Sequence, residues 1–193
     1  MFDNESAISP QLSNLISQFQ SATERVAKME REYSENDWQR KPGPERWSAI
    51  ECIWHLNWTS EKMIENVRRA LARIKSKPKH TGKYHLDIIG WFLVKSLSSK
   101  GRIAKFKTTA PFVSQSMMNI SEELERFRKL QEEVIHTIRE SDGLQLGMGR
   151  VVSAFHARVH YNVYSAFCMT AVHEHRHLDQ AERAAAGESQ SVS

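Results

Sequence analysis

The residues best suited to chemistry lie near the end of the chain, in the stretch MTAVHEHRHLDQAERAAA at residues 169–186. His173, Glu174 and His177 form an H-E-x-x-H motif, the spacing found in zinc peptidases. Residues four apart lie on the same face of a helix, so both imidazoles can reach a single ion. The motif therefore predicts a divalent metal site, with Glu174 either as its general base or as a partner in a surface salt bridge.

A helical projection favours a histidine pair that faces inward. The pair shares its side of the helix with small or apolar residues, namely Val163, Ala166, Thr170, Ala181 and Ala184. His175 points to the opposite side and is expected to face water. A second pair at the same spacing, His156 and His160, lies roughly 100° around the predicted helix and cannot address the same ion. This second pair is the weaker candidate for metal binding.

The residues that follow the H-E-x-x-H motif argue against a peptidase. Peptidases with H-E-x-x-H take their third ligand downstream. Here only residues 178–193 follow, and Gln180 and Arg183 stand where the longer metzincin motif has Gly and His. The last carboxylate of the chain, Glu188, lies in the predicted tail, and no strand-rich segment is available to bind a peptide backbone.

The third ligand is therefore expected upstream, and His55 in the stretch ERWSAIECIWHLNW is the candidate. His55 lies about 12 Å into its predicted helix, and His177 lies about 14 Å before the end of the last helix. If these two helices run antiparallel, the depths coincide. A projection places His55 off the main apolar stripe, nearer Glu51 and Trp58, which predicts a site toward one side of the bundle. A purely structural His55 is the alternative.

The elements that must position these residues are four long helices, which predict an all-α four-helix bundle. Apolar residues at steps of three and four mark helices at about 11–33, 47–75, 116–140 and 155–186, followed by a tail at 187–193. Residues 76–115 form a long crossover, with a short helix predicted in LDIIGWFLVKSL and an extended stretch in FKTTAPFV. The whole chain, 1–193, is read as one domain.

Composition agrees with a helical protein and gives little sign of a membrane or secreted one. The 193 residues include 8 Gly and 5 Pro, and no apolar run approaches the roughly 18–20 residues that a membrane span needs. The start, MFDNESAISP, lacks the features of a secretory signal. Cys52 and Cys168 suggest no disulfide framework and are expected to be small buried hydrophobes. We expect a cytoplasmic protein.

Basic residues are concentrated between Arg68 and Lys107, where Asp87 is the one opposing charge, although the net charge of the chain is only +4. The simplest interpretation is a solvated connection and helix flank. Attraction of an anionic substrate or of nucleic acid is the alternative. Because no recognisable nucleic-acid module surrounds the segment, we do not expect nucleic acid to be a partner.

Two stretches of the chain resemble the signatures of the DinB/YfiT-like superfamily of helical bundles. ERWSAIECIWHL is similar to W-S-x-x-E-x-x-x-H-L, and HEHRHLDQ is similar to H-x-x-x-H-x-x-Q. The resemblance implies a four-helix bundle in up-down-down-up order, often a homodimer. It also implies a divalent metal, commonly zinc or nickel, on three histidines that correspond to His55, His173 and His177. Glu51 and Gln180 are candidates to orient these imidazoles.

The function expected from these features is that of a divalent-metal-dependent enzyme acting on a small-molecule substrate. Three neutral imidazoles and an open position can lower the pKa of bound water or activate a thiolate. Some proteins similar to this family are thiol-dependent transferases, so a thiol-dependent S-transferase or other small-molecule transferase with a low-molecular-weight thiol is preferred. The alternatives are a metal-dependent hydrolase and a non-catalytic, metal-stabilised stress-response binding protein.

Overall fold

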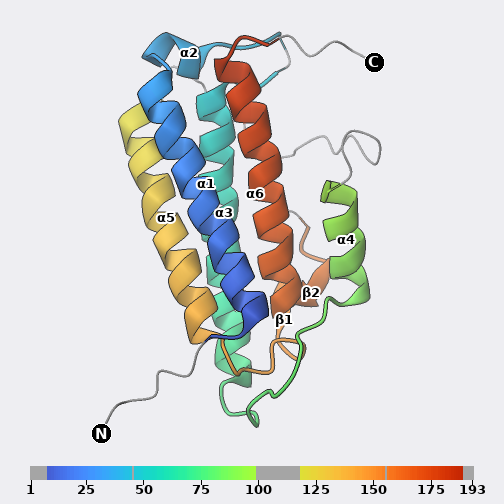
Figure 1. Ribbon diagram of the computed structural model, residues 1–193. Helices are drawn as coiled ribbons and strands as arrows, with labels where there is room; N and C mark the ends of the chain where they lie inside the picture. The colour runs from blue at the N-terminus through green and yellow to red at the C-terminus, as the bar shows by residue number, and fades with distance from the viewer. Residues whose placement is uncertain (1–7, 45, 99–117, 155, 189–193) are drawn as a thin grey trace, which may run out of the picture.

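A computed structural model describes residues 8–44, 46–98, 118–154 and 156–188, and it is mostly helical, as predicted (Figure 1). The long helices are α1 (Pro10–Glu32), α3 (Ala49–Ile74), α5 (Ile120–Glu140) and α6 (Val163–Ala185). Shorter elements are α2 (Glu35–Gln39), α4 (Ile88–Ser98) and the strands β1 (Arg150–Val152) and β2 (His160–Asn162).

The long helices lie side by side, with α1 and α6 pointing one way along the bundle and α3 and α5 the other (Figure 1). Polar contacts between helices agree with these directions, because residue numbers rise together along each parallel pair. The contacts are Gln11–Tyr164 and Arg25–Glu182 between α1 and α6, and Asn57–Glu123 and Arg68–Glu133 between α3 and α5. Helices α3 and α6 are therefore antiparallel, as the depth comparison of His55 and His177 required.

The buried apolar residues form two clusters, one toward each end of the bundle. The first includes Phe19, Val67 and Val134, and the second includes Val26, Leu56 and Leu178. On α3, α5 and α6, buried polar residues occur close to where one cluster gives way to the other, namely Asn57, Thr59, Ser60, Gln131, His173 and Glu174. The predicted metal site thus lies near the junction of two apolar cores.

The last helix begins later than predicted, which is a correction to the range 155–186. Asn162 caps the helix, with its Oδ1 accepting the backbone N–H of Ser165 at 2.7 Å. The preceding residues form an antiparallel β1–β2 hairpin in which Val151 lies opposite Tyr161. Because His160 lies in β2 and His156 precedes the strand, the predicted second histidine pair does not share a helix face.

Local capping explains where α2, α3 and α5 begin. Helices α2 and α3 both begin with a capping box, formed by Ser34 with Asp37 and by Ser48 with Glu51. The short helix expected in the crossover is α4, and the third predicted helix begins at Ile120 rather than at 116. The stretch FKTTAPFV lies outside the described residues.

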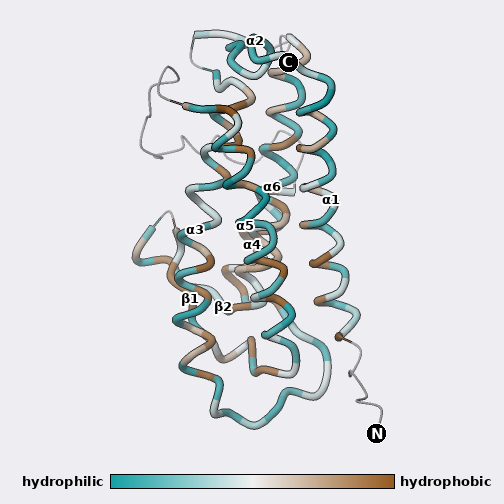
Figure 2. The backbone as a smooth tube through the Cα atoms, turned by 90° about the vertical axis from the view of Figure 1, so that its left-hand side faces the viewer, coloured by the Kyte–Doolittle hydropathy of each residue, from teal (hydrophilic) through white to brown (hydrophobic). Residues whose placement is uncertain are grey.

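Apolar and polar residues alternate along the long helices in the manner of amphipathic helices packed on a shared core (Figure 2). Among the described residues, no helix combines the length and the apolar character required to cross a lipid bilayer.

Candidate metal centre

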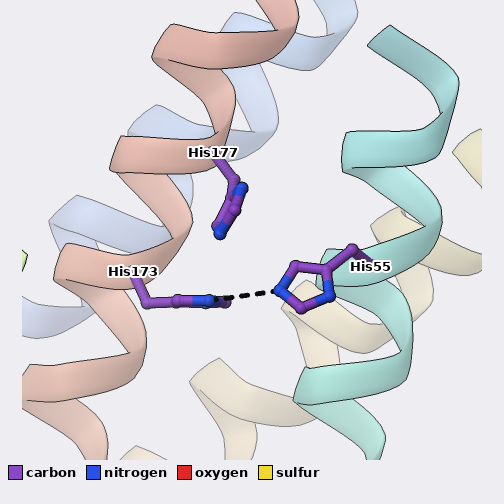
Figure 3. Close-up of side chains that lie close together, drawn as sticks. All are labelled: His55, His173 and His177. Carbon is purple, nitrogen blue, oxygen red and sulfur yellow. Dashed lines mark hydrogen bonds between the residues drawn. The ribbon is translucent and has the colours of Figure 1, made fainter. Parts of the chain in front are cut away.

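Three histidines from two helices converge on one point between α3 and α6 (Figure 3). One ring nitrogen from each of His55, His173 and His177 lies within 4.8 Å of the others. The Nε2 atoms of His55 and His173 are 3.3 Å apart. The ring centroids are separated by 5.2 Å for His55–His173, 4.7 Å for His55–His177 and 4.5 Å for His173–His177. The structure thus brings together all three residues predicted as ligands.

The separation of the nitrogens suits a tetrahedral ion. Two nitrogens bound to one zinc at about 2.0–2.1 Å and at a tetrahedral angle lie roughly 3.3–3.4 Å apart. The 3.3 Å between His55 Nε2 and His173 Nε2 matches this separation. Imidazole is a good ligand for zinc and nickel alike, so the donor set fits either ion.

The imidazoles are also in the protonation state that metal binding needs. Burial lowers the pKa of His55 from 6.5 to about 4. The pKa of His177 falls to about 3, first because of burial and then because of the nearby His55 and Arg176. Burial and the neighbouring histidines lower the pKa of His173 well below its ordinary value. At neutral pH all three rings are uncharged, so each can offer a lone pair to an ion.

His55 is only 1% exposed, although the projection placed it off the apolar stripe of its helix. The first turns of α3 are buried on most sides, because Ala49, Ile50, Cys52 and Ile53 are each fully buried. Helix α2 packs against both α3 and α6 at this end of the bundle. A helical projection assumes one buried stripe, so it fails to predict burial of His55 on a helix that is covered on several sides.

The Trp47 ring packs against two of the three histidines, a contact that the sequence did not predict. Its ring lies 4.9 Å from that of His55 and is stacked at 5.6 Å and 24° on that of His177. The signal available in the sequence was its place in the W-S signature, directly before the Ser48 that caps α3. Trp47 restricts the orientations of two of the three imidazoles.

Glu174, the predicted general base, is buried in the interior of the bundle. The residue is 1% exposed, and its side chain lies near the equally buried Gln131 of α5. Burial raises the pKa of Glu174 to about 8, and the nearby Gln131 amide opposes this rise. Among the described residues, neither Glu174 oxygen nor either polar side-chain atom of Gln131 has a partner at hydrogen-bonding geometry.

The two residues expected to orient the imidazoles have different surroundings. The Glu51 carboxylate accepts the backbone N–H of Ser48 at 2.7 Å and pairs with Lys41 at 2.7 Å. Glu51 thus belongs to the capping box of α3, where its negative charge stabilises the start of the helix. Gln180 lies beside His177, where it opposes the lowering of the histidine pKa.

The remaining candidates are not at the centre. His175 was expected to face water, but its ring is half-buried, with Nε2 at 3.1 Å from the Gln18 carbonyl and Nδ1 at 3.1 Å from Arg25. Burial raises the pKa of the Cys52 thiol strongly and that of Cys168 to about 11. Both thiols are therefore protonated at neutral pH, in agreement with their expected role as packing residues.

Long helices with three histidines converging between α3 and α6 define a class of helical bundles with a candidate metal site. The chain matches the model of the DinB superfamily over residues 18–181, which is most of its length. The protein therefore belongs to the DinB superfamily, as the sequence signatures predicted. A search of curated proteins and a search of solved structures each gave no match.

Proposed function

We propose that this protein binds one zinc or nickel ion through His55, His173 and His177 and uses it in a thiol-dependent transfer reaction on a small molecule. The observation that carries the proposal is the convergence of three uncharged imidazoles from two helices. Three protein ligands leave a tetrahedral ion one open position, which is the pattern of catalytic rather than purely structural sites.

The side chains around the site suit this role. When bound, the ion supplies Lewis acidity that favours the thiolate over the thiol of a ligand. His55 and His173 are buried and would hold the ion with little freedom of movement. Trp47 packs on two of the ligand rings and covers one side of the site. Neither Cys52 nor Cys168 is exposed, so the thiol of the reaction would come from a separate small molecule.

Two alternatives have specific support. A hydrolase would use Glu174 as the proton-transfer group, and a pKa of about 8 is close to the value that such a group needs at neutral pH. This role requires the side chain to turn from the interior toward the ion. A non-catalytic, metal-stabilised binding protein is supported by the position of the site, where an ion would join α3 to α6 near the junction of the two apolar clusters.

The metal content of purified variants tests the site. We expect wild-type protein to bind about one divalent ion per chain and His173→Ala to lose most of it, because two imidazoles seldom hold an ion. Far-UV circular dichroism should show similar helix content in both. His156→Ala is the matched control, since His156 is exposed and lies outside α6. Equal metal content in the His173→Ala variant and wild type would rule out the assignment.

The homodimer and the cytoplasmic location remain expectations of the sequence. Light scattering on the purified chain measures the oligomeric state directly, and a dimer predicts twice the mass of one chain. A mass that corresponds to one chain at all concentrations would contradict it.

A further inference from the structure

The outer face of α4 exposes large apolar side chains. Ile88 is 87% exposed, Phe92 55%, Trp91 53% and Ile89 41%. Ile88, Trp91 and Phe92 lie at steps of three and four residues, so they form one stripe along the helix. An exposed apolar patch on a folded protein usually marks an interaction surface. The stripe therefore indicates a surface that a partner covers.

The opposite face of α4 is packed on the bundle and fixes the direction of the stripe. Leu93, Val94 and Leu97 pack against the core, and a Cβ atom at Gly90 would lie only 2.1 Å from the Oγ of Ser165. The helix packs against α6 and β2 on the outer side of the bundle (Figure 1). Because both faces are apolar, rotation of α4 about its own axis would not hide the exposed one.

A cation lies near each end of this stripe. The Lys95 Nζ lies 4.8 Å from the centroid of the Trp91 ring, one helical turn further along α4. At the other end, Arg150 Nη1 of β1 lies 3.7 Å from an oxygen of Asp87, the residue directly before the helix. The apolar stripe is thus flanked by positive charges that the structure places beside it.

The segments that lead into α4 and pack against it are strongly basic. Between residues 75 and 98 the one acid is Asp87, and between residues 150 and 172 the sequence has no acid. The second segment includes Arg150 and Arg158. The exposed basic residues of the first are Lys75, Lys77, Lys79, Lys83 and Lys95.

The one acid, Asp87, is engaged in holding the fold together. Its carboxylate accepts the backbone N–H groups of Asn162 and Gly90, both at 2.7 Å, and the hydroxyl of Ser165 at 3.2 Å. The Asp87 side chain is 23% exposed, whereas that of Arg150 is 61% exposed. The charge that reaches solvent beside the stripe is therefore mainly positive.

This charge selects among the possible partners. Two copies related by a twofold axis would place the same basic surface against itself, which is unfavourable. Nucleic acid would satisfy the cations, but exposed isoleucines offer no ring on which bases could stack. An anionic lipid surface satisfies both features, because its headgroups attract Lys and Arg while Trp, Phe and Ile enter the boundary with the acyl chains.

We propose that this face of α4 attaches the protein reversibly to the surface of an anionic lipid bilayer. Ile88, Trp91 and Phe92 enter the boundary between headgroups and acyl chains, and Lys95 and Arg150 lie against the headgroup phosphates. The helix lies along the bilayer without crossing it. The inference goes beyond the proposed function and does not depend on the metal site.

Co-sedimentation of the full chain with lipid vesicles tests this attachment. One set of vesicles contains phosphatidylcholine alone, and the other contains phosphatidylcholine mixed with phosphatidylglycerol, so the two differ in surface charge. We expect wild-type protein to bind the anionic vesicles about tenfold more tightly than the neutral ones, because each Lys or Arg near the surface adds to the attraction. Salt should weaken this binding by screening the charges.

Substitutions at exposed positions separate the apolar and the charged contributions. We expect the double variant Ile88→Gln/Phe92→Gln to bind anionic vesicles about tenfold more weakly with unchanged helix content by circular dichroism, because it loses the apolar contact. Lys95→Gln should weaken binding about fivefold. Lys129→Gln is the matched control, since it removes the same charge from an exposed position on α5, across the bundle from α4 (Figure 1).

The other outcomes overturn the proposal. Equal binding of wild type to both kinds of vesicle, or unchanged binding of the Ile88→Gln/Phe92→Gln variant, would contradict it. A wild-type dimer that becomes a monomer in this variant by light scattering would assign the face to a second copy instead. Binding of a single-stranded DNA oligonucleotide in place of vesicles would assign it to nucleic acid. His173→Ala should bind vesicles as wild type does, so failure of the metal site leaves this inference intact.

Discussion

Burial sets the charge of each titratable residue on the inner side of α6. The same physical cause keeps the histidines uncharged and keeps the Glu174 carboxyl protonated, because a buried charge is poorly solvated. The two effects have opposite consequences for the pH dependence of the protein. Histidines that stay uncharged can still bind a metal ion at mildly acidic pH. A carboxyl group that must stay protonated in the folded state makes that state less stable as the pH rises.

The pKa values of the ligands predict metal binding that resists mild acid. Protons compete with the ion for each imidazole, and an ordinary pKa of 6.5 would weaken binding below that pH. With values of about 4 for His55 and about 3 for His177, we expect the zinc dissociation constant to change little between pH 7 and about pH 5. A competition assay with a chromophoric chelator at several pH values measures this. Weakening of binding with a midpoint near pH 6.5 would show that the rings are not buried as described.

Glu174→Gln is expected to stabilise the protein, because Glu174 must stay protonated in the folded state. Its pKa is about 8 when folded and 4.5 ordinarily, so between these values the folded state binds more protons and stability falls as the pH rises. Glutamine carries no charge and has nearly the same shape. We expect a gain of about 1–3 kcal/mol at pH 7, larger at pH 8 and close to zero at pH 4, measured by urea unfolding.

The catalytic interpretation of Glu174 is tested by the same variant. If the side chain acts as a base in a hydrolytic reaction, Glu174→Gln should lose activity while gaining stability. A variant that is less stable than wild type at pH 7 would show that the carboxylate makes a favourable interaction in the folded state.

The convergence of His55, His173 and His177 could be predicted from the sequence, because histidines four residues apart are readily visible and the antiparallel helices bring His55 to the same depth. The contributions of Trp47 and Gln131 could not be predicted in this way. Each contribution depends on which neighbouring helix or loop packs against the residue. The apolar periodicity of a single helix does not carry this information.

At the level of the elements, apolar periodicity predicted three of the four long helices closely and failed at the start of α6. The segment before Asn162 also contains apolar residues, but Val151 and Tyr161 pair across a hairpin instead of continuing the helix. Strands of three residues leave almost no periodic signal. The Asn162 cap was the available indication of the true start, because its side chain accepts the N–H of Ser165.

Helix α4 depends on a glycine for its close approach to α6. A Cβ atom at Gly90 would lie 2.1 Å from the Oγ of Ser165 and 2.2 Å from its Cβ, so α4 would have to move. We expect Gly90→Ala to destabilise the protein by about 1–3 kcal/mol, the usual cost of overpacking, as measured by urea unfolding. Gly147→Ala is the control, because a Cβ there would have no atom within 4 Å. Equal stability of the Gly90→Ala variant and wild type would mean that α4 is not held in this position.

At the level of the whole molecule, the candidate centre connects helices that are far apart in sequence. His55 lies on α3, and His173 and His177 lie on α6, near the junction of the two apolar clusters. An ion held by both helices would bind the folded chain and not the unfolded one. Metal binding at this site would therefore be coupled to the stability of the bundle as a whole.

Thermal unfolding with and without metal measures this coupling. Zinc at 100 times its dissociation constant stabilises a folded protein by about 2.7 kcal/mol. For a chain of this length, that energy corresponds to a rise in Tm of roughly 5–10 °C. We expect the rise in wild type and in His156→Ala and its loss in His55→Ala, which lacks the ligand from α3. A catalytic site further predicts that chelated wild type keeps its helix content at 25 °C, whereas unfolding on chelation would favour the non-catalytic, metal-stabilised alternative. An equal rise in His55→Ala would mean that the ion does not bridge the two helices.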